Sequence, residues 1–232
     1  MNIKIIFKMI AFLLMLTGIF MMLGIPFSIY YKDDDISSLL ISGCFTSIVG
    51  VIIWLFTRNT ESKELGKREG YLIVTLGWLS MAVFGAIPFV VYGAIPNYAD
   101  AFFETMSGFT TTGATILADI EAVPAGLLFW RSLTQWLGGM GIIVLSLAIL
   151  PILGIGGMQL FTAEVPGITP DKLHPRVSET AKRLWGIYAF LTFAEMILLL
   201  IGGMSLFDAI NHSFTTMATG GFSTKNASTA YY

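Results

Sequence analysis

Two segments of the chain, 108 residues apart, carry the same order of polar and small residues. They are residues 100–115 and residues 208–223, and an alignment without gaps places Gly113 on Gly221. Each segment joins a short apolar stretch to a stretch rich in threonine and glycine. Main-chain carbonyl and hydroxyl oxygens in such a stretch can replace the water around a bare cation. The repeat therefore predicts an ion-binding or ion-conducting site built twice.

The composition indicates an integral membrane protein. Of the 232 residues, 55% are hydrophobic and 12% are charged, and the mean hydropathy is +0.77. A soluble domain carries about 25% charged residues. Irregular backbone at membrane depth is tolerated only where it is buried in protein or lines a water-filled path. Because the repeats lie between long apolar runs, an ion-conducting filter is the leading interpretation.

Five apolar runs are long enough to cross a bilayer, which takes about 20 residues. They cover residues 5–30, 36–57, 70–94, 125–153 and 183–204. The first run is longer than the apolar part of a signal peptide, and no small-x-small cleavage site follows it. We therefore predict that it is a retained span.

The charges are sorted between the two sides of this predicted topology. Ten of the 13 lysine and arginine residues fall on the side of the N-terminus, which predicts that this side is cytoplasmic. The opposite side carries the acidic residues Asp33, Asp34, Asp35, Asp100, Glu104, Asp119, Glu121 and Asp208. Acidic groups around an outer vestibule would raise the local cation concentration. Taken alone, the run 33–35 favours a solvated loop surface instead.

Each repeat is predicted to contain a helix that enters the membrane and stops half-way. A helix over residues 100–109 would be about 15 Å long, which is half a bilayer, and residues 208–217 would form its counterpart. Asp100 and Asp208 stand at the expected helix starts, where aspartate is a favoured N-cap. The C-terminal end of each helix would direct partial negative charge toward a cation. Glycine in each following segment would permit unusual backbone angles.

Three motifs stand out: Thr-Thr-Thr-Gly-Ala-Thr at 110–115, Gly-Gly-Phe-Ser-Thr at 220–224 and the Gly-Gly-Met-Gly run that begins at 138. They resemble motifs of the Trk/Ktr/HKT superfamily of potassium transporters, most closely the TrkH type of bacterial inner membranes. The resemblance implies a potassium channel folded from one polypeptide, with four span–pore–span repeats around a central path. By position, the K⁺-binding filter residues would be Thr111, Thr112, Gly113, Ala114, Thr219, Gly220, Gly221 and Phe222. Threonines 111, 112 and 219 and glycine 220 are the leading candidates for ion ligands, and no organic cofactor is implied.

The predicted fold is an all-α integral membrane protein with channel-like repeats. Two leading transmembrane helices and a basic loop occupy 1–69, and a complete span–pore–span repeat follows at 70–157. A cytoplasmic connector occupies 158–182, and a second repeat, truncated after its filter, occupies 183–232. We therefore expect the N-terminal half of a transporter whose C-terminal half supplies the remaining repeats. The expected partners are membrane lipid, a second copy in a homodimer and, by resemblance, a cytoplasmic nucleotide-binding regulatory subunit near 158–182.

Other functions fit the sequence less well. A secondary transporter with broken helices would bind Na⁺ or a substrate at the midplane, but its repeats are expected to be inverted, whereas these run in the same direction. A membrane enzyme would gather ionisable groups at one interface, and none cluster. Nothing in the sequence indicates a nucleic-acid partner. The single cysteine, Cys44, allows no intrachain disulfide.

A few polar residues inside apolar runs leave alternatives open. Glu195 lies mid-span, where an ionisable group is expensive. It faces the pore, pairs with a basic group, or lies at a shallower depth and is neutralised against a neighbouring helix. Arg131 and Gln135 share a helical face, for which snorkelling or a structural contact is expected rather than ion handling. His212 aligns with Glu104 and is expected to pack or form a hydrogen bond in the second half-helix.

Overall fold

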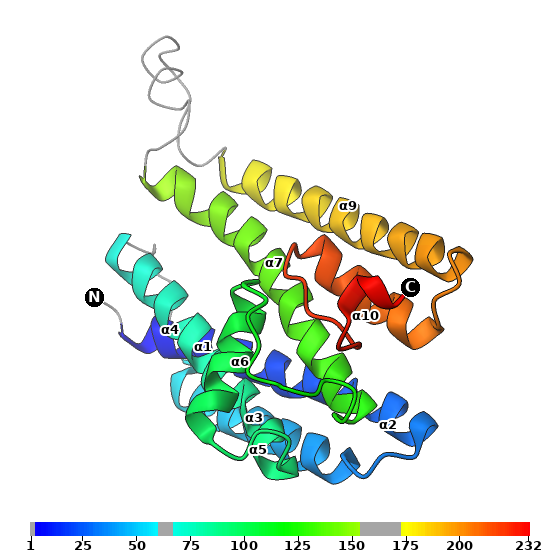
Figure 1. Cartoon of the computed structure of the whole chain (residues 1–232). Helices are drawn as coiled ribbons and strands as arrows, with labels where there is room; N and C mark the ends of the chain where they lie inside the picture. Colours follow the sequence, from blue (N-terminus) through cyan, green and yellow to red (C-terminus); the bar gives the residue numbers. More distant parts are fainter. Residues whose placement is uncertain (1–2, 60–66, 154–172) are drawn as a thin grey trace.

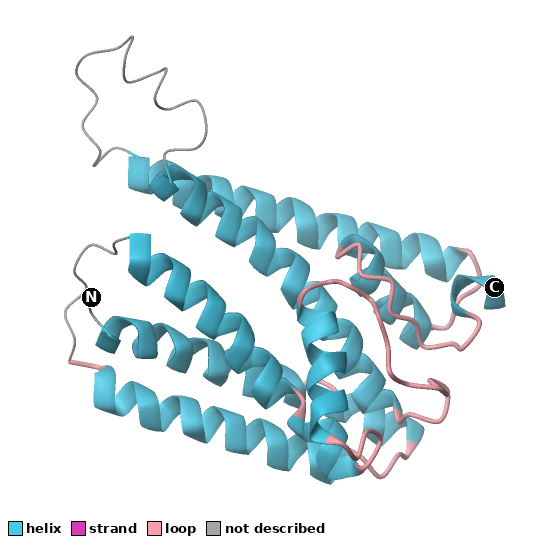
Figure 2. Ribbon diagram, turned by 60° about the vertical axis from the view of Figure 1, so that its left-hand side comes forward, coloured by secondary structure: helices cyan, strands magenta, loops and turns pink. Residues whose placement is uncertain are grey.

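The structure is a computed structural model that describes residues 3–59, 67–153 and 173–232. These residues form helices and loops, with no strand among them (Figure 2). The helices are α1 (Ile3–Met22), α2 (Ile25–Tyr31), α3 (Ile36–Thr57), α4 (Lys67–Gly85), α5 (Ile87–Tyr92), α6 (Tyr98–Phe109), α7 (Ala125–Leu153), α9 (Leu173–Ile201), α10 (Leu206–Met217) and the 3-10 helix η2 (Ser228–Tyr231). The all-helical class predicted from the sequence is therefore confirmed.

Four helical segments are long and apolar enough to cross a membrane. They are Ile3–Tyr31, Ile36–Thr57, Arg68–Tyr92 and Thr180–Ile201. These segments agree with four of the five predicted spans. The fifth predicted span is helix α7, which has 29 residues, and its side chains after Gly141 lie outside the described ones. Most of the connector predicted at 158–182 also lies outside the described residues.

Two of these spans are broken near their C-terminal ends by the same tripeptide. Ile-Pro-Phe stands at residues 25–27 and again at 87–89, and in each case a short helix, α2 or α5, begins there. Proline lacks an N–H group and its ring clashes with the preceding turn, so a helix bends or restarts at it. The chain therefore changes direction before it reaches the loops at 32–35 and 93–97.

Helix α3 packs closely along α1, forming the leading hairpin of the molecule (Figure 1). A β-carbon at Gly18 would overlap the carbonyl oxygen of Gly43, and one at Gly43 would lie 2.7 Å from the carbonyl oxygen of Gly18. Small residues allow such an approach between helices in a membrane. The outward side of the hairpin keeps large apolar side chains, such as Phe12, Phe45 and Phe56, exposed, as expected for a surface that faces lipid.

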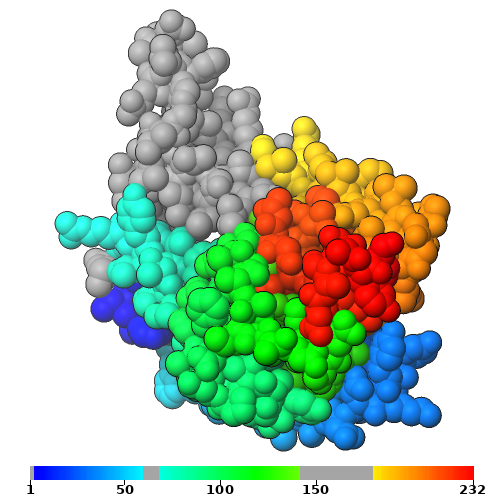
Figure 3. Space-filling model, viewed as in Figure 1, coloured from blue at the N-terminus to red at the C-terminus, as the bar shows by residue number. Residues whose placement is uncertain are grey.

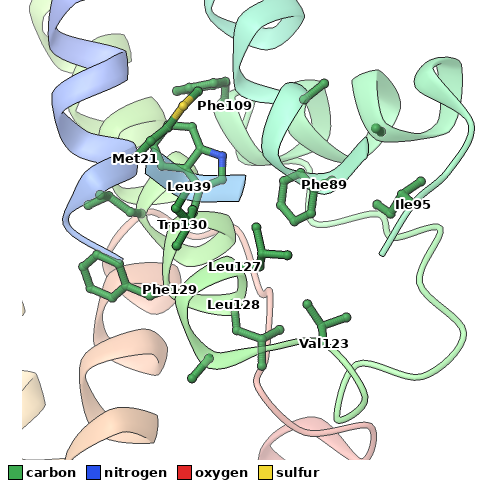
Figure 4. Packing of buried hydrophobic residues seen from close by; sticks show 14 of the residues in the cluster. Met21, Leu39, Phe89, Ile95, Phe109, Val123, Leu127, Leu128, Phe129 and Trp130 are labelled. Atoms are coloured by element: carbon green, nitrogen blue, oxygen red, sulfur yellow. The ribbon is translucent and has the colours of Figure 1, made fainter. Parts of the chain in front are cut away.

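The apolar core surrounds the N-terminal half of α7 (Figure 4). Trp130 is fully buried there, and its ring lies at a steep angle to that of Phe109, with the centroids 6.1 Å apart. The Trp130 Nε1–H donates to the carbonyl oxygen of Gly85 at 3.0 Å. Phe89 from α5 and Leu127 from α7 complete the same cluster. This core fixes α4, α5 and α6 against α7.

Two carboxylates of the leading hairpin cap the start of α7. Asp33 Oδ2 accepts the N–H of Ala125 at 2.8 Å, and Asp35 Oδ2 accepts the N–H of Leu127 at 3.0 Å. Both groups lie where a helix N-terminus favours negative charge. Burial raises the pKa of the Asp35 carboxyl above its usual value, although hydrogen bonds from Ser28 and Leu127 oppose the shift.

The expectation of a solvated surface for 33–35 is therefore wrong for one residue and incomplete for another. Asp35 is fully buried and Asp33 half-buried, while Asp34 alone is exposed. The sequence gives no sign of this, because the amides that these carboxylates cap lie 92 residues further along the chain.

Candidate ion-binding segments

Helices α6 and α10 have the same length and begin 108 residues apart, so the offset of the sequence repeat is also the offset of the structure. Their N-caps are Asn97, whose Oδ1 accepts the N–H of Ala99 at 3.0 Å, and Ser205, whose Oγ accepts the N–H of Asp208 at 3.1 Å. The prediction that Asp100 and Asp208 are the caps is wrong. Both lie in the first helical turn, where a carboxylate suits the helix dipole.

Both helices end in the same unusual turn. Thr111 and Thr219 have φ angles of 55° and 56°, and they occupy the left-handed position that glycine normally takes after a helix. Their N–H groups and those of the next residues donate to carbonyl oxygens of the last turn at 2.8–2.9 Å. A β-branched residue in this region costs about 1–3 kcal/mol, and such strain concentrates at functional sites.

Glycine follows two residues later in each segment. Gly113 has a φ of 75° and Gly221 a φ of 81°, angles that only glycine adopts without strain. Each segment thus has a positive φ at alternate residues, in the same register. We name residues 111–114 the first candidate filter segment and residues 219–222 the second.

The main-chain carbonyl oxygens of these segments are largely unpaired. Among the described residues, no hydrogen bond reaches the carbonyl oxygens of 111–113 or 219–222. More than 90% of buried backbone carbonyls in proteins have a partner, and Gly220 and Phe222 are both buried. Ala114 differs from the rest of the first segment, because its carbonyl oxygen accepts Ser107 Oγ at 2.6 Å. Oxygens left free in this way are available to an ion or to water.

The two candidate filter segments touch each other, and the contact is asymmetric. A β-carbon built on Gly113 would overlap the carbonyl oxygen of Gly220, whereas one built on Gly221 would meet nothing within 4 Å. The equivalent glycines of the two repeats therefore face a packed neighbour in one case and open space in the other.

Side chains of helix α7 contact the second candidate filter segment and hold it in place. Gln135 Oε1 accepts the N–H of Phe222 at 3.1 Å. The Arg131 guanidinium lies 3.6 Å from the centroid of the Phe222 ring. The Phe222 side chain is only 2% exposed, so of this predicted filter residue only the main chain can face an ion.

Arg131 itself is buried, with 2% exposure. Its Nε donates to Glu104 Oε1 at 2.6 Å, and its Nη1 donates to the carbonyl oxygen of Ser223 at 3.0 Å. The expected structural contact is therefore present, and snorkelling is not. Glu104, which the sequence suggested as a vestibule charge, is 1% exposed and belongs to this ion pair. Asp208 is likewise 8% exposed and accepts Thr224 Oγ1 at 2.5 Å.

The aligned residues Glu104 and His212 do similar work in the two repeats. Thr115 Oγ1 donates to Glu104 Oε1 at 2.9 Å, and Ser223 Oγ lies 3.5 Å from His212 Nε2. Each pair ties the residue that follows a candidate filter segment back to the helix before it, α6 or α10. The hydrogen bond expected for His212 is thus present.

Further hydrogen bonds join the loops that follow the two candidate filter segments. Asn226 Oδ1 accepts the N–H of Ile120 at 2.7 Å, its Nδ2 donates to Asp119 Oδ1 at 2.8 Å, and its N–H donates to Glu121 Oε1 at 3.1 Å. In the space-filling view the C-terminal residues lie directly against the region that follows α6 (Figure 3). Asp119 and Glu121 remain exposed at this surface.

Glu195 is half-buried on α9, within hydrogen-bonding reach of Thr216 on α10. Of the alternatives left open by the sequence, this proximity favours a contact with a neighbouring helix. Among the described residues, no group of three or more His, Cys, Asp or Glu side chains could hold a metal ion.

Comparison with known proteins decides the family. The TrkH family profile, described as a cation transport protein, matches residues 36–232. The chain belongs to the TrkH family. Within it, the Trk system potassium uptake protein TrkH of Salmonella typhimurium is 46% identical over 235 residues, covering 100% of this chain and 48% of the relative. The TrkH of Escherichia coli K12 is 53% identical over 187 residues, covering 79% of this chain and 38% of the relative.

A solved structure of the TrkH family also superimposes on the chain. The crystal structure of the potassium transporter TrkH from Vibrio parahaemolyticus has a TM-score of 0.85 and 39% sequence identity, covering 100% of this chain and 46% of that one. The chain thus spans about half the length of the relatives that it matches. The resemblance proposed from the three sequence motifs is confirmed.

Proposed function

We propose that this chain supplies half of a K⁺ uptake pathway, with residues 111–114 and 219–222 as two of four filter segments. The observation that carries the proposal is the pair of matching segments with free carbonyl oxygens, in contact between Gly113 and Gly220. Relatives over the full length of this chain are named potassium uptake proteins. The names of these relatives point to K⁺ as the ion, and the two segments provide the oxygens that would bind it.

In this proposal a K⁺ ion exchanges its water shell for main-chain oxygens. The alternating positive φ angles at Thr111 and Gly113, and at Thr219 and Gly221, turn successive peptide planes so that their carbonyl oxygens can share one side. The C-terminal ends of α6 and α10 add partial negative charge. A full carboxylate is not required, and none occurs in either segment.

The order of the elements supports span–pore–span units as the finer architecture. Two leading spans would occupy 1–69. The first unit, at 70–157, would consist of the span α4–α5, the pore helix α6 and the span α7. The second unit, at 183–232, would begin with the span α9 and the pore helix α10. The open space at Gly221 is where the filter of a third unit would pack, by analogy with Gly113 and Gly220. The C-terminal half of a full-length transporter would supply it.

The placement of basic residues supports a bacterial inner-membrane protein whose N-terminus is cytoplasmic. Within that membrane a homodimer, with a nucleotide-binding regulatory subunit against the cytoplasmic connector at 158–182, is the proposed assembly. Crosslinking of the full-length protein in membranes would test both contacts.

The function is tested in a K⁺-uptake-deficient bacterial strain. A full-length transporter with these 232 residues as its N-terminal half should restore growth at low K⁺, whereas residues 1–232 alone should not, because they provide two filter segments of four. Growth restored by the 232 residues alone would contradict the four-segment proposal. Failure of the full-length protein, present in the membrane at a normal level, would contradict K⁺ uptake itself.

A further inference from the structure

One buried ion pair reaches the ends of both candidate filter segments. Arg131 Nε and Glu104 Oε1 lie 2.6 Å apart, and both side chains are almost completely buried. Arg131 comes from α7 and Glu104 from α6, and both residues precede the second repeat in the chain. A buried pair of this kind costs desolvation energy that its mutual attraction only partly repays. Its presence therefore calls for a role other than stability.

The carboxylate fixes the chain just after the first candidate filter segment. Glu104 Oε1 accepts Thr115 Oγ1 at 2.9 Å, and Glu104 Oε2 accepts the N–H of Ile116 at 2.8 Å. Both carboxylate oxygens are thus occupied, and together with the Arg131 bond they leave Glu104 little freedom to turn. The segment that leaves Ala114 is held at two consecutive residues.

The guanidinium fixes the chain at and just after the end of the second candidate filter segment. Arg131 Nη1 donates to the carbonyl oxygen of Ser223 at 3.0 Å, and the guanidinium lies over the Phe222 ring. Arginine suits this position because its planar fork donates in two directions and also stacks on an aromatic face. The Arg131 side chain therefore contacts Glu104, which holds the chain after the first segment, and also the Phe222 ring and the backbone just after the second segment.

The second repeat indicates why a charged pair is used in the first. His212 and Ser223 make the equivalent hydroxyl contact without an ion pair, so holding that hydroxyl does not require two charges. Unlike the His212 contact, the ion pair connects one repeat to the other. Because the two charges compensate each other, the pair also leaves no net positive charge to repel a cation.

We propose that Arg131 and Glu104 form a positioning pair that sets the spacing between the two candidate filter segments and thereby the preference for K⁺ over Na⁺. The inference rests on the proposed function. Discrimination between the two ions depends on the arrangement of the coordinating oxygens, and a binding site must be held to within about 0.5 Å of its productive geometry. A single buried bridge between the segments suits that requirement.

The test is the ratio of K⁺ to Na⁺ uptake by the full-length transporter carrying Arg131→Gln. Arg183→Gln is the matched control, because Arg183 is exposed at the surface of α9. We expect the ratio to fall by roughly tenfold in R131Q, because the bonds from Arg131 to Glu104 and to Ser223 are both lost from a site with about 0.5 Å tolerance. The ratio should stay unchanged in R183Q. Arg131→Lys keeps the charge without the fork, so its ratio should lie between wild type and R131Q.

A merely structural role predicts a different result. It would lower the amount of transporter in the membrane without moving the ratio in the protein that remains. An unchanged ratio in R131Q at a normal membrane level overturns the inference. If R131Q does not accumulate, Glu104→Gln, which keeps the size of the side chain, decides by the same measurement. A wild-type protein without K⁺ preference would instead contradict the proposed function.

Discussion

The contact between Gly113 and Gly220 gives the sharpest prediction for the candidate filter. Replacing Gly113 by alanine adds a single methyl group at a residue with a φ of 75°. The added carbon would overlap the carbonyl oxygen of Gly220, which is main chain and cannot rotate away like a flexible side chain. Either Gly113 or the second candidate filter segment has to move.

Two costs follow from the structure. Alanine in the left-handed region costs about 1 kcal/mol relative to glycine. To clear the methyl group, the Gly220 carbonyl must also shift by roughly 1 Å, about twice the tolerance of a preorganised site. We expect the K⁺ to Na⁺ uptake ratio of the full-length transporter to fall at least about tenfold, equivalent to about 1.4 kcal/mol. Gly113→Ser should act in the same direction.

Gly93→Ala is the matched control. Gly93 has a φ of 90° at the end of α5, and a β-carbon there would meet nothing within 4 Å. It therefore carries the same backbone strain without the collision. Uptake of K⁺ is measured against a range of Na⁺ concentrations, with each variant quantified in the membrane fraction.

The reasoning would be refuted if Gly113→Ala reached the membrane at the wild-type level and kept the wild-type ratio. It would also fail if Gly93→Ala lowered the ratio equally, because strain alone would then explain the loss. Gly221→Ala tests whether further filter segments pack beside the second one in the full-length protein. A loss as large as that of Gly113→Ala in the full-length protein would indicate that another segment packs at Gly221.

Three further predictions concern stability. Asp35→Ala should lower the free energy of unfolding in detergent by about 1–2 kcal/mol through loss of a helix cap, while Asp34→Ala, at an exposed residue, should leave it unchanged; equal losses would contradict the capping role. Because burial raises the folded-state pKa of Asp35, the neutral form favours the fold: unfolding should become harder as pH falls through that pKa, and Asp35→Asn, which still accepts the Leu127 N–H, should remove this dependence. Thr111→Gly should raise the midpoint of thermal unfolding, because the relieved strain of about 1–3 kcal/mol exceeds the roughly 0.4–1 kcal/mol that glycine costs through the unfolded chain. It should also weaken K⁺ preference, and Thr219→Gly should behave alike; a lower midpoint in both would argue against strain.

The repeat was predictable because it is written in the sequence without a gap. The offset of 108 residues relates the N-caps Asn97 and Ser205, the strained residues Thr111 and Thr219, and the ends of both helices. The N-caps themselves were assigned wrongly, because aspartate is favoured both as a cap and in the first helical turn. Only the geometry of the backbone separates these two roles.

The contacts between the repeats could not be read from the sequence. Glu104 resembles any other outer acidic residue, and nothing local shows that its partner is Arg131, on a helix that begins after a long loop. Phe222 aligns with Ala114, which says nothing of where a large ring would go. Pairings of this kind depend on how α6, α7 and α10 pack, and packing is decided by the whole chain.

The aspartates that cap α7 also bear on how the protein is made. Leu127 emerges from the ribosome 92 residues after Asp35, a delay of roughly 5–20 s at about 5–20 residues per second. Throughout that interval the carboxylates have no amide partners, so the newly inserted hairpin must keep them in contact with water at the membrane surface. A hairpin that settles too deep in the membrane before α7 arrives would bury two unpaired charges. Asp33 and Asp35 therefore require that the hairpin stay near the membrane surface until α7 has been inserted.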